Sequence, residues 1–168
     1  MNLFFTFICI ALGTMSGLYF SKRSQAKVRY YAGMVELCDA LRRNLMFRRD
    51  KLPLFLTEHE PEEKLLVKHL QKFGLFVSGE LPLLKADEKK EKSYLERGYL
   101  KQKEVEQVQK FLEGLGAGDS ATEIEGIDSY RELFAELHGK YKANNDKMGT
   151  AYTKLGFLGG LAAGIILI

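Results

Sequence analysis

The charged residues of this chain are confined to its middle. The sequence contains 25 Lys and Arg and 22 Asp and Glu, and all of them fall between Lys22 and Lys154. Charged side chains are costly inside lipid, so a charged middle with two apolar ends favours a membrane-anchored protein over an ordinary soluble enzyme. The net charge of +3 is too small to indicate a nucleic-acid-binding protein.

The N-terminal apolar run, residues 2–21, is long enough to cross a bilayer. Its twenty uncharged residues would form a helix of about 30 Å. A cleaved signal peptide is the alternative, and it needs a basic segment before the run and a small-residue cleavage site after it. Only Met1 and Asn2 precede the hydrophobic residues, and Tyr19 and Phe20 close the run. We therefore expect a retained transmembrane anchor at residues 1–21.

The C-terminal apolar run is shorter. Residues 151–168 contain Lys154 as their only charge and would form a helix of about 27 Å. The ammonium group of a lysine near a helix end reaches the membrane interface. The uncharged part alone has fourteen residues, so the terminal helix of a soluble domain is the alternative. We expect a second transmembrane helix at residues 151–168.

Basic residues next to the first run predict the orientation. Lys22, Arg23, Lys27 and Arg29 follow it, and positive charge resists translocation. Residues 22–150 are therefore expected to form a cytoplasmic domain, with both ends of the chain on the other side. Cys38 would lie in a reducing compartment and Cys9 in lipid, so no disulfide is expected.

The middle of the chain has helical periodicity. After Lys22, apolar residues recur in steps of three and four, which predicts one buried helix face. This face comprises Tyr31, Met34, Val35, Cys38, Leu41 and Leu45. We predict an all-α fold, a cytoplasmic helical bundle flanked by transmembrane helices.

Prolines and glycines predict the shorter helices. Leu52-Pro53 is typical of a helix start, as is the sequence at residues 61–63, where Pro precedes two Glu. The second of these helices is expected to bury Leu65, Leu66, Leu70 and Phe73 and to end at Gly74. A further helix is expected from Tyr94 or Lys101 to Leu115, with Val105, Val108, Phe111 and Leu112 buried.

The last predicted helix carries a heptad pattern. The series comprises Ile127, Tyr130, Phe134, Leu137, Tyr141, Asn144, Met148, Ala151, Leu155 and Leu158. It predicts one long helix that packs along a seam and continues into the C-terminal run. Asn144 is a candidate register-setting contact. We favour packing within the bundle, because the other helices also need partners. A coiled-coil dimer is the alternative.

The glycine-rich segment at residues 114–123 precedes this helix. It lacks the Gly-Lys-Ser/Thr of a phosphate loop and a preceding strand, so we expect a tight turn between helices. The turn and its cap comprise Leu115, Gly116, Asp119 and Ser120. Asp119 or Ser120 would be the N-cap, and from Ser120 the side chain of Glu123 would complete a capping box.

Glycines at spacing four mark the two apolar runs. They are Gly13 and Gly17 in the first, and Gly156, Gly160 and Gly164 in the second. Small faces let helix backbones approach closely in lipid, so these residues are candidates for membrane helix packing within the chain or with a neighbour. The alternative is that glycine is simply common in membrane helices.

Candidate chemistry is confined to one basic patch. The three His are scattered and have no Cys or acid at metal-ligand spacing, so we expect no enzyme, no metal and no cofactor. Two arginine doublets form a candidate partner-binding patch: Arg42, Arg43, Arg48 and Arg49. Such a patch suits an acidic partner protein or anionic lipid headgroups, and a solvated basic face is the alternative.

Three stretches resemble stage III sporulation protein AB of endospore-forming bacteria. Residues 152–161 resemble the family's Tyr-x-x-Leu-Gly-x-Leu-Gly-Gly-Leu ending. Leu115-Gly116-x-x-Asp119 resembles its Leu-Gly-x-x-Asp turn, and residues 41–54 resemble its long first helix followed by a Pro-Leu step. Residues 75–93 match only in length and helical character, and Glu123 stands where related sequences tend to carry glutamine.

The resemblance implies a fold and a function. The fold is a small all-α bundle similar to the cytoplasmic domains of the F-type platform protein of type II secretion. The function is that of an adaptor coupling a cytosolic secretion-type ATPase to membrane components of a channel complex. By the same resemblance it lies in the outer forespore membrane and faces the mother cell. The alternative is a self-associating structural or lipid-surface membrane protein without an ATPase partner, and a homo-oligomer stays open in either case.

Overall fold

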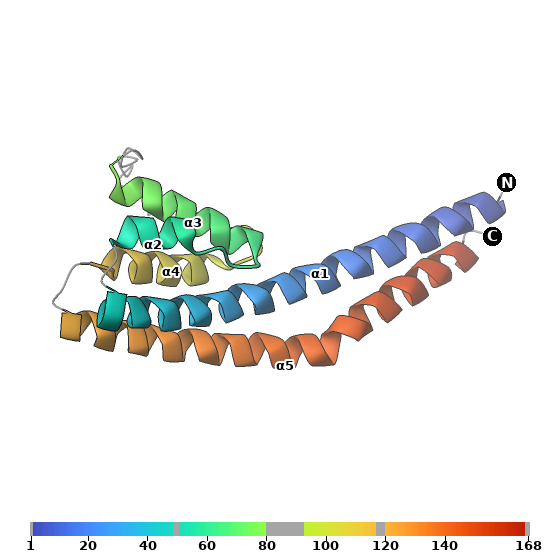
Figure 1. The fold of residues 1–168 in the computed structure, drawn as a ribbon. Coiled ribbons are helices and arrows are strands. Elements are labelled where there is room, and N and C mark those ends of the chain that lie inside the picture. Colours follow the sequence, from blue (N-terminus) through green and yellow to red (C-terminus); the bar gives the residue numbers. More distant parts are fainter. Residues whose placement is uncertain (1, 49–50, 80–92, 117–119, 167–168) are drawn as a thin grey trace. The chain divides into compact units, whose positions relative to one another are not determined.

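The computed structural model describes residues 2–48, 51–79, 93–116 and 120–166 (Figure 1). Every regular element among these residues is a helix, which confirms the all-α prediction. The elements are α1 (Asn2–Arg43), the π-helix η1 (Asn44–Arg48), α2 (Leu52–Glu58), α3 (Lys64–Val77), α4 (Gln102–Gly114) and α5 (Ser120–Ile166).

The chain divides into two compact units. Residues 1–28 and 138–168 form one unit, which we call the terminal helix pair. Residues 29–137 form the other, which we call the bundle unit. α1 and α5 contribute to both units, and α1 continues without a break beyond the N-terminal apolar run. The predicted domain limits, 1–21, 22–150 and 151–168, were set by membrane crossing and stay predictions.

In the bundle unit, α1 buries a wider face than its single predicted stripe. The predicted residues Tyr31, Met34, Cys38 and Leu41 are buried, and Val35 and Leu45 are half-buried. Tyr30 and Leu37 are also fully buried. The Tyr31 ring packs on Phe134 of α5, whereas Tyr30 packs on His69 of α3. α1 is therefore covered on two sides, because α3 and α5 both pack against it.

α2 begins where its proline predicts, whereas α3 begins three residues after the predicted start at Pro61. α2 starts at Leu52 with Pro53 in its first turn, and α3 starts at Lys64 directly after the acidic residues. α3 buries all four predicted leucine and phenylalanine side chains, and His69 with them. The predicted end of α3 at Gly74 is wrong, since the helix continues to Val77. The left-handed residue that follows it is Gly79, with φ of 77°.

α4 begins at Gln102, so the start near Lys101 is confirmed and the alternative start at Tyr94 is wrong. The local reason is a cap: the Glu104 carboxylate accepts a hydrogen bond from the Lys101 N–H at 2.6 Å. The four predicted core residues of α4 are all buried: Val105, Val108, Phe111 and Leu112.

α5 follows its heptad pattern only in part. Ile127 and Phe134 are buried, but Met148, Leu155 and Leu158 are 37%, 62% and 58% exposed. The predicted seam is therefore wrong in its second half, and Asn144 is exposed rather than register-setting. A straight α-helix drifts about 20° per heptad away from a 3.5-residue repeat, so the contacting face moves around the helix.

In the terminal helix pair, the contacting face of α5 contains glycine. A Cβ added at Gly13 would overlap the Gly156 carbonyl oxygen and lie 3.0 Å from the Gly160 Cα. A Cβ at Gly17 would lie 2.5 Å from the Tyr152 carbonyl oxygen. The two backbones touch because no side chain separates them. The structure thus brings four of the five predicted glycines together within one chain, and the surroundings of Gly164 lie outside the described residues.

Two ring contacts set the relative level of the paired helices. Phe20 lies 6.3 Å from Tyr152, centroid to centroid, and the Lys27 ammonium lies 4.4 Å from the Tyr141 ring centroid. As the residue number rises on α1, the number of its partner on α5 falls. The pair is therefore antiparallel, and the segment just after the N-terminal apolar run lies beside the segment just before the C-terminal one.

No helix among the described residues has both the length and the apolar character needed to cross a membrane. The predicted transmembrane helices at 1–21 and 151–168 are therefore not supported by the described part of the chain.

We predict opposite effects for two glycine substitutions on one helix. Gly156→Ala places a methyl group against the α1 backbone and should lower the stability of the helix pair by about 1–3 kcal/mol, the usual cost of overpacking. A Cβ at Gly159 meets nothing within 4 Å. Gly159→Ala should therefore be neutral or stabilising by up to about 1 kcal/mol, through helix propensity. Thermal unfolding of the full-length variants measures both, and equal midpoints would contradict the packing.

Candidate functional site

The four predicted arginines differ in their surroundings. Arg42 of α1 is paired, because its Nε lies 3.3 Å from an Asp128 carboxylate oxygen of α5. Arg43 is exposed at the end of α1, where its charge also suits the helix C-terminus. Arg48 ends η1, but its side chain, like the whole of Arg49, lies outside the described residues. Of the four, Arg43 is the one that the structure describes as exposed and outside a described ion pair.

A second ion pair lies beside the first. Arg131 Nε is 2.6 Å from one carboxylate oxygen of Asp39, and its Nη2 is 3.5 Å from the other. This hydrogen bond raises the pKa of the Arg131 guanidinium. The acid at 39 and the base at 42 on α1 therefore face a base at 131 and an acid at 128 on α5. Each helix carries its acid and base three residues apart, and this spacing is the sequence signal that could have predicted the double pair.

Exposed apolar side chains accompany Arg43. Met46 and Phe47 of η1 are 50% and 78% exposed, and Leu54 of α2 is 55% exposed. We call Arg43, Met46 and Phe47 the η1 surface. Aromatic, Met and Arg side chains are enriched at protein–protein contacts, and π-helical turns are frequent at functional sites. The sequence pattern identified the arginines but not Met46 and Phe47 as a candidate surface. These apolar residues directly follow the buried helix face of α1, so the sequence does not distinguish them from core residues.

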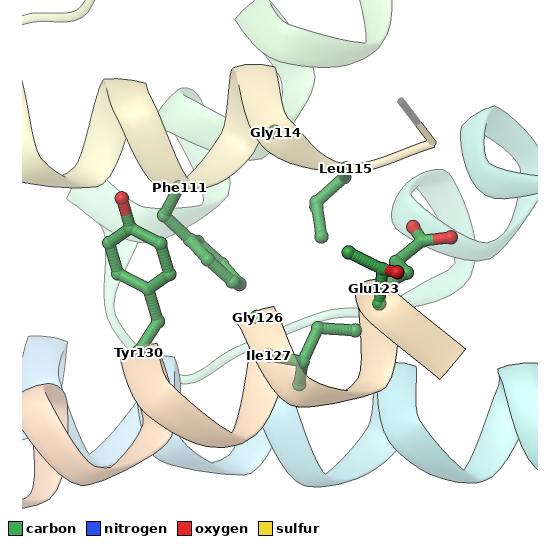
Figure 2. A pocket seen from close by; sticks show the side chains of 8 residues that line it. Phe111, Gly114, Leu115, Glu123, Gly126, Ile127 and Tyr130 are labelled. Atoms are coloured by element: carbon green, nitrogen blue, oxygen red, sulfur yellow. The ribbon is translucent and has the colours of Figure 1, made fainter. Parts of the chain in front are cut away.

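The α4–α5 turn borders an apolar pocket. Its lining residues are Phe111, Gly114, Leu115, Thr122, Glu123, Gly126, Ile127 and Tyr130, several of which point into it in Figure 2. The cavity measures about 270 Å³, which is just below the range of about 300–1,000 Å³ for small-molecule sites. It is therefore large enough for a side chain or two of a partner and small for a cofactor.

Hydrogen bonding at the turn differs from a simple capping box. Gly116 has a φ of 80°, which explains glycine at this position. Its N–H donates to Glu123 Oε1 at 2.7 Å. Leu115 is buried, and Ser120 is the exposed first residue of α5. The Asp119 cap lies outside the described residues. Glu123 thus reaches back across the turn.

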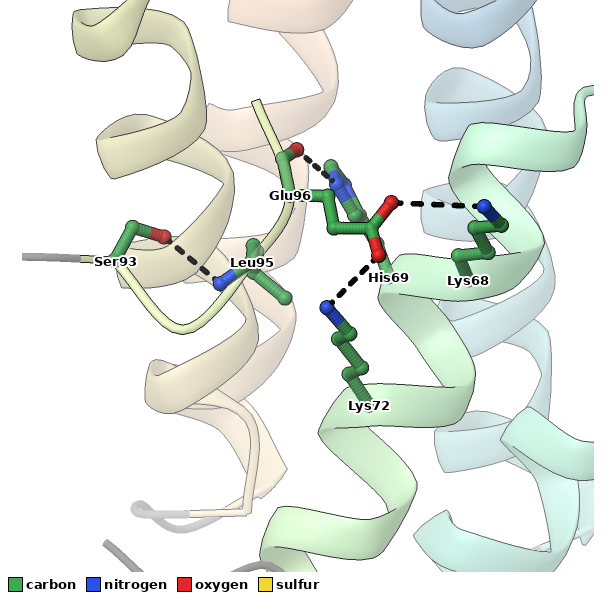
Figure 3. A network of polar contacts seen from close by, with 6 residues as sticks. All are labelled: Lys68, His69, Lys72, Ser93, Leu95 and Glu96. Atoms are coloured by element: carbon green, nitrogen blue, oxygen red, sulfur yellow. Dashed lines mark hydrogen bonds and ion pairs between the residues drawn. The ribbon is translucent and has the colours of Figure 1, made fainter. Parts of the chain in front are cut away.

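A buried histidine joins α1, α3 and residues 93–100. His69 Nε2 lies 2.7 Å from the Glu96 carbonyl oxygen, which only accepts, so Nε2 carries the proton. Nδ1 then accepts from the Tyr30 hydroxyl, also at 2.7 Å. Burial lowers the pKa of His69. Figure 3 shows the same segment held from outside, where Lys68 and Lys72 contact the Glu96 carboxylate at 3.6 and 3.2 Å. This histidine has a structural role.

Other titratable groups of the bundle unit are also held by packing. Burial raises the pKa of the Cys38 thiol to about 12, and Asp39 adds to the effect, so this free cysteine is protonated and unreactive at neutral pH. Arg29 Nε lies 3.2 Å from the buried carboxylate of Glu63. In the described part of the chain, no group of three or more His, Cys, Asp or Glu is placed to hold a metal ion.

Sequence comparison decides the family. The sequence model of stage III sporulation protein AB matches residues 2–168. The chain belongs to this family. Membership implies a role in stage III of sporulation. Among curated proteins and solved structures, no significant match to the chain was found.

We predict that the ion pair between Asp39 and Arg131 tolerates an exchange of its two charges, but not the reversal of one charge alone. Asp39→Arg would place three arginines around Asp128, and Arg131→Asp would place three acids together, so each single variant should lower the unfolding temperature. The double variant restores opposite charges and should recover most of the loss. Thermal unfolding in low salt measures this. A double variant as unstable as the worse single variant would show that the pair contributes little.

We also predict that acid destabilises the bundle unit through histidine. The folded-state pKa of His69 is lowered by burial, so between this pKa and the ordinary value near 6.5 the unfolded chain binds the proton more readily. The free energy of unfolding should be fully retained above about pH 6.5 and fall as the pH falls below it. Burial also lowers the pKa of His59. His69→Gln should reduce the slope between pH 7.5 and 5.5 more than His59→Gln, measured by denaturant unfolding.

Proposed function

We propose that this chain is a membrane-anchored platform of the sporulation channel complex, which couples a cytosolic secretion-type ATPase to membrane components. Family membership carries the sporulation role. The division into a bundle unit and a terminal helix pair fits an adaptor, since one unit can bind a cytosolic partner while the other binds membrane components. The likeness to the F-type platform protein of type II secretion belongs to the same proposal, as does the outer forespore membrane facing the mother cell.

The membrane part of the proposal rests on exposed apolar side chains. In the terminal helix pair, Phe7, Leu12 and Met15 are 60–76% exposed on α1. Leu155 and Ile165 are 62% and 61% exposed on α5. Contiguous apolar surface of this kind marks a protein or membrane contact. A lipid environment would cover these side chains on both helices at once.

The ATPase contact is assigned to the η1 surface. An exposed arginine beside an exposed phenylalanine and methionine has the composition of a binding hot spot. The charge of Arg43 suits an acidic surface on the partner. Arg42 is a less direct candidate, because its pairing with Asp128 makes it part of the α1–α5 contact. Reversal of all four arginines would therefore disturb packing as well as binding.

The experiment is a crosslinked pull-down of the tagged full-length chain from membranes of sporulating cells, read by mass spectrometry. We expect a secretion-type ATPase together with other membrane components. The double variant Arg43→Glu/Phe47→Ala should reduce ATPase recovery by about tenfold or more, as expected when hot-spot side chains are lost.

A matched control separates this contact from general surface changes. Lys110→Glu/Leu75→Ala also reverses one cation and truncates one exposed apolar side chain of the bundle unit. The control should recover the ATPase at the wild-type level. Equal losses in both variants would remove the η1 surface from the proposal. Recovery of the chain only with itself would instead favour the alternative, a self-associating structural or lipid-surface protein without an ATPase.

A further inference from the structure

The two units carry charge of opposite sign. The terminal helix pair has seven Lys or Arg and one acid, Asp146, a net formal charge of +6. The bundle unit carries the balance of the chain's +3, a net charge of −3. The whole-chain charge therefore hides a strongly basic segment. It is assembled from both ends of the sequence, which is why reading along the chain does not reveal it.

The basic side chains gather at one level of the helix pair. Lys22, Arg23 and Lys27 lie on α1, and Lys140, Lys142 and Lys147 lie on α5. We call these six the basic belt. Contacts of Gly17 with Tyr152 and of Lys27 with Tyr141 fix the antiparallel register, so the two groups lie beside each other. At about 1.5 Å per residue, the belt spans on the order of 10 Å along the helices.

Five of the six belt side chains are exposed, and Lys27 is half-buried over Tyr141. Directly beside the belt, on the side of the chain ends, lie Tyr19 and Phe20, which are 62% and 54% exposed. Beyond them lie the exposed apolar side chains of both helices. The order along the pair is therefore apolar, aromatic and basic, apart from Lys154, which is the one charged residue on the apolar side of Tyr19 and Phe20. This order matches the acyl chains, the interface and the headgroups of a bilayer.

We infer that the basic belt binds the anionic headgroups of membrane lipids and selects them over zwitterionic ones. Each Lys or Arg near an anionic surface typically raises the association constant for that surface about fivefold. The inference rests on the proposed membrane anchoring, and it requires the helix pair to reach a bilayer without requiring either helix to cross one. The inference therefore assigns the contact with anionic lipid to the terminal helix pair, and not to the arginine doublets considered in the sequence analysis.

The test uses the full-length chain reconstituted in phosphatidylcholine bilayers, with nitroxide-labelled phosphatidylglycerol or phosphatidylcholine as probe. Electron paramagnetic resonance measures the fraction of each probe that is immobilised at the protein surface. We expect phosphatidylglycerol to be favoured several-fold at low salt and less in 0.5 M salt, because counterions screen the belt.

Two triple variants make the comparison specific. Lys140→Gln/Lys142→Gln/Lys147→Gln removes half of the belt and should bring the selectivity close to one. Lys64→Gln/Lys103→Gln/Lys110→Gln removes the same charge from exposed lysines of the bundle unit and should leave the selectivity unchanged. Loss of selectivity in both variants would overturn the belt and indicate a net-charge effect.

The remaining outcomes separate the inference from the proposed function. If the wild-type chain immobilises both probes equally, the inferred selectivity of the basic belt is wrong, and the proposed membrane anchoring is retained. If neither probe is immobilised, the chain does not contact lipid, and the belt and the membrane part of the proposed function both fail.

Discussion

Antiparallel pairing of α1 with α5 is the constraint on which the other features of this structure depend. In the terminal helix pair the two backbones touch at Gly13 and Gly156. In the bundle unit the same two helices are joined by two ion pairs, Arg42 with Asp128 and Arg131 with Asp39. The pairing brings segments that are more than eighty residues apart in the sequence side by side. It therefore decides which charges and which apolar side chains share a surface.

The bundle unit is completed by a polar connection inside an apolar core. His69 is fully buried, and both of its ring nitrogens are hydrogen-bonded, to the Tyr30 hydroxyl and to the Glu96 carbonyl. Burial without such partners would cost a few kcal/mol. The network fixes the non-helical residues 93–100 against α3. The bundle unit thus carries the η1 surface and the α4–α5 pocket on a packed apolar interior.

Helix positions followed from local sequence wherever a local interaction sets them. The start of α2 at Leu52-Pro53 and the start of α4 after Lys101 depend on proline geometry and on a carboxylate cap, which are readable within four residues. The predicted end of α3 at Gly74 failed because glycine is tolerated inside a helix whose other face is buried. The second half of the heptad seam failed because the partner of α5 is α1 of the same chain, which accepts a drifting contact face.

By itself, the sequence determined the all-helical class, the apolar ends with their glycines, and the membership in the sporulation family, since composition, periodicity and motifs are properties of short stretches. Only the tertiary structure decided what those stretches contact. It paired Arg42 with Asp128, left Arg43 and Phe47 exposed together, and set Lys22 of α1 on one level with Lys147 of α5. Side-chain partners across such distances in sequence depend on the register between helices, and that register is fixed by packing, which local sequence does not encode.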